Sequence, residues 1–193
     1  EIHPYNHLPD IKDMPELKGI ILSGSPCSVT DDDAPMISVS DFTDEYPLLA
    51  ICYGAQMMAH QKGGEVIPSK IREYGRARLR HLDLHSGLLK EMTAESEVWM
   101  SHGDTIAEVP SDFEVIASTD TVRVAAYKLK GKETYGIQFH PEVTHSTEGK
   151  TVLRNFVVHI CGCSQEWTSD QFVESTVETL QNQLKDDKVV LGL

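Results

Sequence analysis

The chain has 193 residues, 40% of them hydrophobic, a length that suits one α/β domain with some sequence to spare. Thirty acidic and 17 basic residues give a net charge of −13, which argues against a nucleic-acid-binding surface. Because we find no signal peptide and no apolar run long enough for a membrane, we expect a cytoplasmic protein with no membrane partner. The four cysteines follow neither a disulfide nor a zinc-site spacing, so we predict no metal site.

The first half of the chain predicts two parallel strands. Residues 19–23 form a short apolar strand that runs into a turn-rich loop at 24–28. The four apolar residues at 48–51 predict a strand buried on both faces, and residues 55–61 predict the helix that follows it. A strand, a crossover and a second strand indicate a parallel sheet whose functional loops lie at the carboxyl ends of its strands.

Cys52 lies on the sharp turn between the buried strand and the helix. Gly54 supplies the conformational freedom that we expect this turn to need. A thiol at this point is held out of the sheet, and the amides of the helix N-terminus favour its thiolate form. The nucleophilic serine of α/β-hydrolases is presented on the same kind of turn. The alternative is that Cys52 is one more small buried residue, the usual state of a free cysteine.

The sequence after Gly64 is more typical of β-structure. Loose alternation at 76–84 precedes four predicted strands, at 97–100, 113–118, 122–129 and 134–139. We expect the first of these to end at the polar group Ser101–Asp104 and the last to end at His140–Glu142. Together with the loop at 24–28 and the Cys52 turn, polar groups then follow four strand ends.

Two helices are predicted near the C-terminus, at 150–161 and 168–185. The second begins with Thr168 to Gln171, a sequence of capping-box form. The last residues, 188–193, predict the opening of a strand. Because a strand needs a neighbour, we expect it to pair with a longer part of the molecule or with another chain.

Cys52 requires a base, and His140 is the best candidate because it follows a strand that the sheet can bring beside the turn. Glu142, two residues further on, can accept a hydrogen bond from the imidazole and set its tautomer. The amide of Tyr53 and an amide of the Gly24–Ser25 loop can stabilise a developing oxyanion, each by about 3 kcal/mol. Taken singly, one of nine histidines and one turn are more often structural.

Three motifs resemble the glutaminase domain of class I glutamine amidotransferases. They are Ser-Gly-Ser-Pro at 23–26, Cys-Tyr-Gly-Ala-Gln at 52–56 and Gln-Phe-His-Pro-Glu at 138–142. Further segments at 72–75, 98–104, 140–145 and 186–193 resemble the glutamine-hydrolysing GMP synthetases within that class. In one departure from the family pattern, Ser25 stands where a second glycine is usual.

The resemblance implies a fold and a domain plan. The fold is α/β, a three-layer sandwich of flavodoxin-like type with a mostly parallel, mixed central sheet. Residues 1–163 would form the amidotransferase domain, without the strand and helix that open the family's sheet. Residues 164–187 would form a linker helix, and residues 188–193 the first strand of an ATP-pyrophosphatase domain absent from this sequence.

The resemblance also implies the chemistry. Cys52 would attack the carboxamide of L-glutamine, and His140, held by Glu142, would protonate the leaving ammonia and then activate water. The oxyanion hole would be formed by Gly24, Ser25 and Tyr53. The substrate glutamine would be held by Gln56, Ser101, His102 and Gly103.

The resemblance assigns the use of the ammonia to other parts of a longer protein. An ATP-pyrophosphatase domain in cis, with ATP and Mg²⁺, would convert XMP to GMP, and the full-length protein would be a homodimer. The fragment itself would need no cofactor. Two alternatives stay open, namely a different class I amidotransferase that feeds another acceptor, and a non-catalytic docking module of the same fold.

Overall fold

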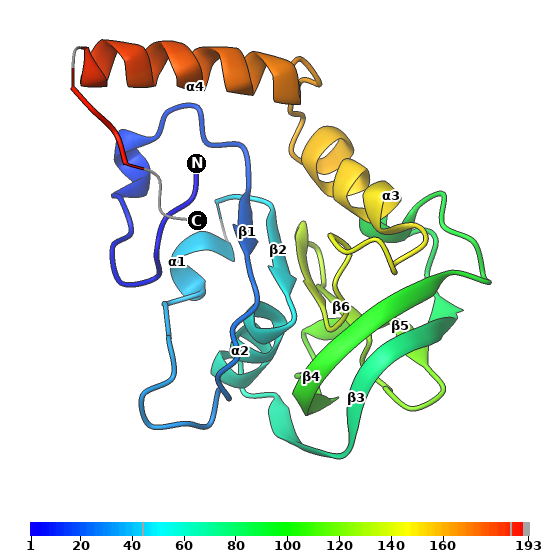
Figure 1. The fold of residues 1–193 in the computed structure, drawn as a ribbon. Coiled ribbons are helices and arrows are strands. Elements are labelled where there is room, and N and C mark those ends of the chain that lie inside the picture. Colours follow the sequence, from blue (N-terminus) through cyan, green and yellow to red (C-terminus); the bar gives the residue numbers. More distant parts are fainter. Residues whose placement is uncertain (44, 186, 191–193) are drawn as a thin grey trace. The chain divides into compact units, whose positions relative to one another are not determined.

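The computed structural model describes residues 1–43, 45–185 and 187–190, apart from the side chains of residues 70–73. By its internal contacts the chain divides into two compact units, Glu1–Cys163 and Ser164–Leu193. The sheet and the predicted site residues all belong to the first unit (Figure 1).

Seven strands form one sheet within the described residues, in the order β1-β2-β7-β6-β5-β3-β4. Their bounds are β1 Ile20–Leu22, β2 Leu48–Ile51, β3 Glu65–Leu82, β4 Glu97–Glu108, β5 Phe113–Thr119, β6 Ala126–Leu129 and β7 Thr134–Ile137. Strand β2 is parallel to both of its neighbours, β1 and β7. The other four pairings are antiparallel.

The expectation of a mostly parallel sheet is therefore wrong, since two of the six pairings are parallel. The physical reason is the length of the connections. Strands β6 and β7 are joined by residues 130–133 alone, and a connection this short can only reverse the chain direction. A mixed sheet with helices on both faces is what the sequence builds.

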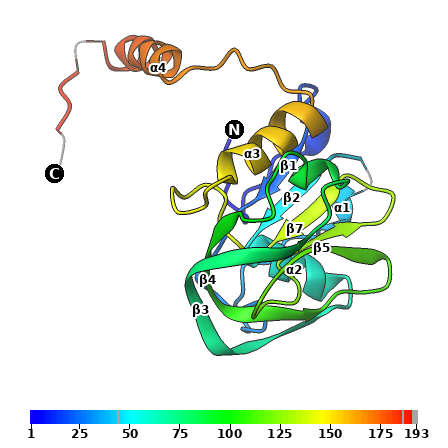
Figure 2. The ribbon, with the colours of Figure 1, turned by 90° about the vertical axis from the view of Figure 1, so that its right-hand side faces the viewer.

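Helices pack on both faces of the parallel part of the sheet (Figure 2). Helix α2 (Tyr53–Gln61) covers one face, while η2 (Gly87–Leu89), α3 (Gly149–Arg154) and the π-helical η3 (Asn155–Ile160) cover the other. Strand β2 shows the division clearly, because Leu48 and Ala50 face the α2 core and Leu49 and Ile51 face the α3 core. As predicted, all four of its residues are buried.

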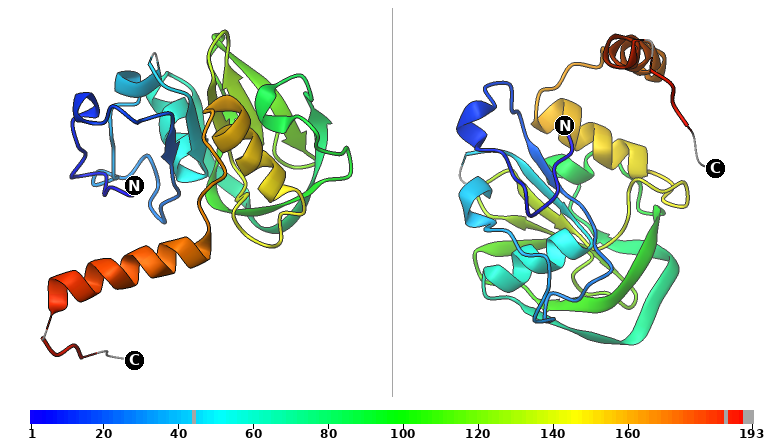
Figure 3. Two further views of the ribbon diagram at one scale, coloured as in Figure 1. Left: turned by 90° about the horizontal axis from the view of Figure 1, so that it is seen from above. Right: turned by 60° about the vertical axis from the view of Figure 1, so that its left-hand side comes forward.

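Strand β1 lies at the edge of the sheet, next to the segment that precedes it (Figure 3). Two short helices, η1 (Ile11–Asp13) and α1 (Ser40–Thr43), lie before and after it in the chain. Ile21, in the middle of β1, is 45% exposed. It borders a mainly apolar groove of about 710 Å³ whose lining includes Leu22 and Met57.

The sheet curls so that its other edge strand, β4, reaches the segment that follows β7. The amide of His140 donates to the carbonyl of Trp99 at 2.9 Å, and the amide of Thr147 donates to the carbonyl of Glu97 at 2.9 Å. The side chain of Ser146 adds a third link, accepting from the amide of Trp99 at 3.0 Å. This closure brings the beginning of β4 beside the segment that follows β7.

The sequence pattern predicted that the polar group Ser101–Asp104 follows the end of a strand. In the structure this group lies inside β4. Strand β4 continues to Glu108 because β3 pairs with it from Glu65 to Arg78, forming a long two-stranded ribbon. The hydrophobic pattern marks only 97–100 as a strand, since the residues beyond it are polar. The group still reaches the predicted site, through the curl of the sheet rather than through a strand end.

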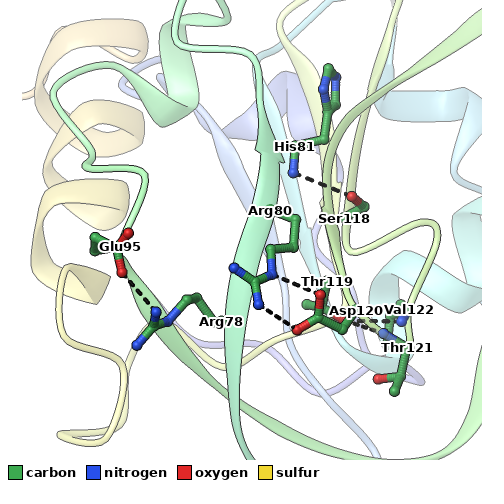
Figure 4. A network of polar contacts seen from close by, with 9 residues as sticks. All are labelled: Arg78, Arg80, His81, Glu95, Ser118, Thr119, Asp120, Thr121 and Val122. Atoms are coloured by element: carbon green, nitrogen blue, oxygen red, sulfur yellow. Dashed lines mark hydrogen bonds and ion pairs between the residues drawn. The ribbon is translucent and has the colours of Figure 1, made fainter.

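Exposed ion pairs link β3 to the segments beside it (Figure 4). Arg80 makes a two-pronged contact with Asp120, at 2.7 and 2.8 Å, and Arg78 contacts Glu95 at 2.8 Å. The guanidinium of Arg80 lowers the pKa of the Asp120 carboxyl. These charged groups pair with one another at the surface of the protein.

The second unit contains helix α4, which spans Ser169–Leu184. Its N-cap is the predicted one, because the hydroxyl of Thr168 accepts from the amide of Gln171 at 3.2 Å. Residues 188–190 have no regular secondary structure, and residues 191–193 lie outside the described residues, so the strand at 188–193 stays a prediction. No helix in the described part of the chain is long and apolar enough to cross a membrane.

Candidate active site

Cys52 is the single residue between β2 and α2, and its backbone is strained. It has φ 51° and ψ −106°, a left-handed conformation that costs a residue with a side chain about 1–3 kcal/mol. Its amide donates to the carbonyl of Ile137 at 2.8 Å, and its carbonyl accepts from Gln56 at 3.0 Å. The strand ladder and the first helical turn therefore both hold Cys52 in this conformation, which presents its thiol at the end of the sheet.

Gly54 has a different role from the predicted one. The positive φ falls on Cys52, while a Cβ on Gly54 would stand 2.7 Å from the carbonyl oxygen of Leu22. Gly54 is thus required because helix α2 approaches the backbone of β1 closely, and the conformational freedom of the turn does not depend on it.

The environment of the Cys52 thiol favours its protonated form. The residue is 5% exposed, and burial raises the pKa of the thiol to about 11, against a smaller lowering by the amide of Tyr53. The charge of Glu142 raises this pKa further. The predicted stabilisation of the thiolate by the helix N-terminus is thus outweighed by desolvation, and the thiol must pass its proton to a base when it reacts.

His140 and Glu142 form the predicted pair. Nδ1 of His140 lies 2.7 Å from Oε1 of Glu142, and the imidazole is 18% exposed. Because an ionised carboxylate only accepts hydrogen bonds, this contact places the proton on Nδ1 and leaves Nε2 as the acceptor. The backbone of His140 is held by Ser146, whose hydroxyl donates to the His140 carbonyl at 2.6 Å. The sequence interpretation did not identify Ser146.

Gly24 lies against both Cys52 and His140. A Cβ on Gly24 would stand 3.8 Å from Cβ of Cys52 and 3.6 Å from Cε1 of His140. Neighbouring Ser25 keeps a negative φ, and its hydroxyl accepts from the amide of Cys27 at 3.2 Å. The loop that contains the predicted oxyanion donors therefore borders the sulfur and the imidazole, and Ser25 needs no glycine-like conformation to be there.

Of the four predicted glutamine-binding residues, two use their side chains inside the protein. The side-chain nitrogen Nε2 of Gln56 donates to the carbonyl of Asp104 at 2.9 Å, and Nδ1 of His102 donates to the same oxygen at 2.8 Å. Burial lowers the pKa of His102, which favours the neutral imidazole. The other two lie on β4: the carbonyl of Ser101 is 3.8 Å from the Cys52 sulfur, and Gly103 is exposed.

Asp104 is the residue that the sequence interpretation missed at this site. Its carbonyl accepts from two predicted residues, Gln56 and His102, and its carboxylate accepts from the hydroxyl of Ser28. Among the residues that the structure describes, no group of three or more His, Cys, Asp or Glu side chains is placed to hold a metal ion.

A thiol on a strand-to-helix elbow, with an imidazole bonded to a carboxylate nearby, is the set of groups that the predicted nucleophilic site would use, and the comparisons show the family. The chain belongs to the glutamine amidotransferase class-I family, whose model matches residues 1–160. Along all 193 residues it is 62% identical to the glutamine-hydrolyzing GMP synthase of Cytophaga hutchinsonii and 53% identical to that of Bacteroides thetaiotaomicron. The alignments cover 100% of this chain and 38% of each relative, so the chain spans less than half of their length.

Solved structures agree with this assignment. A Thermoplasma acidophilum protein assigned to the GMP synthases superimposes with a TM-score of 0.60 and 32% identity, over 71% of this chain and 64% of that one. A glutamine amidotransferase from Methylobacillus flagellatus gives a TM-score of 0.57 at 27% identity, over 72% of this chain and 56% of that one. The curled mixed sheet described above is thus the class I amidotransferase fold.

Proposed function

We propose that this chain hydrolyses L-glutamine to glutamate and ammonia, with Cys52 as the nucleophile, His140 as the acid and base, and Glu142 as the group that orients His140. The observation that carries the proposal is the setting of the two reactive groups. A strained elbow holds Cys52, the Gly24 backbone lies against both Cys52 and His140, and Nδ1 of His140 is bonded to a carboxylate at 2.7 Å. This is the nucleophile, base and orienter arrangement that acyl transfer requires.

The first half of the reaction forms a thioester. The sulfur of Cys52 attacks the amide carbon of glutamine while Nε2 of His140 takes the thiol proton, and Glu142 stabilises the resulting imidazolium. His140 then gives this proton to the amide nitrogen, the carbon–nitrogen bond breaks, and ammonia leaves. The raised pKa of Cys52 makes the base necessary, because little thiolate exists at neutral pH without it.

The second half releases glutamate. Nε2 of His140 takes a proton from water, the hydroxide formed attacks the thioester carbon, and the carbon–sulfur bond breaks as Cys52 regains a proton from His140. In both halves the charge on the carbonyl oxygen would be stabilised by the amide of Tyr53 and by an amide of the Gly24–Ser25 loop. Removing one such donor typically costs about 3 kcal/mol of barrier.

We place the substrate between the elbow and strand β4. Ser101 and Gly103 would line this side with main-chain groups. Gln56 and His102 would act indirectly, because their side chains bond the Asp104 carbonyl and so fix the backbone of β4. In this position the carboxamide of glutamine would reach the sulfur of Cys52 next to the carbonyl of Ser101.

For the whole protein we propose a GMP synthase. Residues 164–187 would link the glutaminase to an ATP-pyrophosphatase domain in cis that begins with the strand at 188–193. That domain would use ammonia, ATP and Mg²⁺ to convert XMP to GMP, in a cytoplasmic homodimer. The support is the 62% identity to a named GMP synthase over the full chain. We assign no residue of this chain to ATP or Mg²⁺.

Activity measurements on the full-length protein test both levels of the proposal. Cys52→Ala should abolish glutamine hydrolysis and glutamine-dependent GMP formation, while GMP formation from ammonium, XMP and ATP continues. Cys27→Ala, which changes an exposed cysteine, is the matched control and should keep both activities. Glutamine hydrolysis by pure Cys52→Ala protein would overturn the nucleophile, and an acceptor other than XMP would overturn the GMP synthase assignment.

A further inference from the structure

Asp104 connects three segments of the candidate site through its own two acceptor groups. Its main-chain carbonyl accepts from Gln56 on α2 and from His102 on β4, at 2.9 and 2.8 Å. Its carboxylate oxygen Oδ2 accepts from the hydroxyl of Ser28 at 2.5 Å. Ser28 belongs to the loop after β1, 76 residues away in sequence, so this bond joins two parts of the fold that no strand pairing connects directly.

The hydroxyl of Ser28 is well placed to donate to Asp104. Because a carboxylate only accepts, Ser28 must supply the proton, and its oxygen then accepts from Thr30, whose hydroxyl lies at 2.8 Å and whose amide lies at 3.3 Å. The amide of Ser28 in turn donates to the carboxylate of Asp31 at 2.9 Å. Next to it, Val29 is 3% exposed and packs in the α2 core.

The loop held in this way is the one that borders the reactive groups. Gly24 stands against Cys52 and His140, and a hydrogen bond joins Cys27 to Ser25 just before Val29 enters the core. The far end of the bond, Asp104, lies three residues after Ser101, whose carbonyl is 3.8 Å from the Cys52 sulfur. The bond thus closes a ring of contacts around the nucleophile.

We infer that the Ser28–Asp104 hydrogen bond is a latch that keeps the Gly24–Ser25 amides in line with Cys52, so that both residues are positioning residues for oxyanion stabilisation. This inference rests on the proposed glutaminase function. A charged acceptor makes the hydrogen bond strong, and an oxyanion donor acts only when it is held in place before the reaction. A displacement of about 1 Å in such a group can lower the rate about 100-fold.

The test compares kcat and KM for glutamine hydrolysis in the full-length protein. Ser28→Ala should lower kcat about 10- to 100-fold with KM changed less than about threefold, and Ser28→Thr, which keeps the hydroxyl, should restore most of it. Asp104→Ala, which removes the acceptor, should resemble Ser28→Ala, and the double variant should be no worse than either single one. The matched control is Tyr135→Phe, which removes another hydroxyl-to-carboxylate bond, to Glu133, at the opposite end of β7.

A second readout separates positioning of the oxyanion donors from general damage. The γ-aldehyde analogue of glutamine adds to the thiol, forming a carbon–sulfur bond while the thiol proton passes to the former carbonyl oxygen, so it uses the oxyanion site. Alkylation of Cys52 by iodoacetamide has no carbonyl oxygen to stabilise at the reacting carbon. Ser28→Ala should weaken aldehyde inhibition in parallel with kcat and change the alkylation rate less than about threefold.

Each other outcome overturns the latch. A folded Ser28→Ala protein with wild-type kcat shows that the bond is not needed, and an equal loss of aldehyde binding and alkylation shows structural damage. If Ser28→Ala does not fold, the same readouts on Asp104→Asn decide: its neutral amide oxygen is a weaker acceptor than the carboxylate, so a partial loss of kcat supports the latch and a wild-type kcat overturns it. If the wild-type protein hydrolyses no glutamine through Cys52, the proposed function fails first, so the two failures are distinguishable.

Discussion

Gly149, the first residue of α3, packs directly against the main chain of Pro141. A Cβ on Gly149 would stand 2.8 Å from the carbonyl carbon of Pro141 and overlap its carbonyl oxygen. Pro141 lies between His140 and Glu142, the two residues whose side chains are bonded at 2.7 Å. The start of a helix and the candidate catalytic base are therefore packed against the same short segment.

We expect Gly149→Ala to lower kcat for glutamine hydrolysis about 10- to 100-fold, because the added methyl group must displace Pro141 and with it His140 or Glu142. Ala is otherwise the better helix former, so any loss comes from the close approach and not from helix propensity. Gly87→Ala is the control, because its Cβ would meet nothing closer than 3.4 Å. Wild-type kcat in Gly149→Ala would show that this packing does not control the base.

Glu142→Gln should lower kcat about 10- to 100-fold and leave KM nearly unchanged. The amide keeps the shape but cannot stabilise an imidazolium as a carboxylate does. Glu142 is 51% exposed, so we expect a smaller effect than for a buried orienting carboxylate. Glu91→Gln removes a charge that pairs with Arg154 at 2.7 Å outside the site and should leave kcat unchanged. Equal kcat in both variants would remove Glu142 from the mechanism.

The parts of the site that local patterns can show were predictable from the sequence. The buried strand, the elbow at Cys52 and the spacing of His140 and Glu142 depend on residues adjacent in the chain. The extent of β4 was not predictable, because Ser101 to Asp104 are polar and become strand only by pairing with β3. The Ser28–Asp104 bond was missed for a related reason, since nothing local in either segment indicates a partner 76 residues away.

The strain at Cys52 can be measured without any chemistry at the thiol. Neither Cys52→Ala nor Cys52→Gly has a nucleophile, but only glycine adopts φ 51° and ψ −106° without steric cost. We expect Cys52→Gly to have a higher free energy of unfolding than Cys52→Ala, by about 1 kcal/mol. Chemical denaturation of the two variants measures this difference. A more stable alanine variant would show that the elbow is not strained.

Burial of Cys52 predicts a specific pH dependence for its alkylation by iodoacetamide. With a pKa raised from 9.0 to about 11, the thiolate is scarce at neutral pH, and the rate should rise about tenfold per pH unit from pH 7 to 10 without a plateau. Mass spectrometry can follow Cys52 and the exposed Cys27 in the same sample.

The same shift has a consequence for stability, with a definite sign. Because the folded-state pKa lies above the ordinary value of 9.0, protonated Cys52 stabilises the fold, and this contribution is complete below pH 9 and lost as the pH rises towards 11. As the pH rises from 9 to 11, the free energy of unfolding of the wild type should therefore fall relative to that of Cys52→Ala. An alkylation rate that levels off below pH 9, with no such shift in stability, would mean that the helix N-terminus or His140 keeps the thiol as thiolate despite its burial.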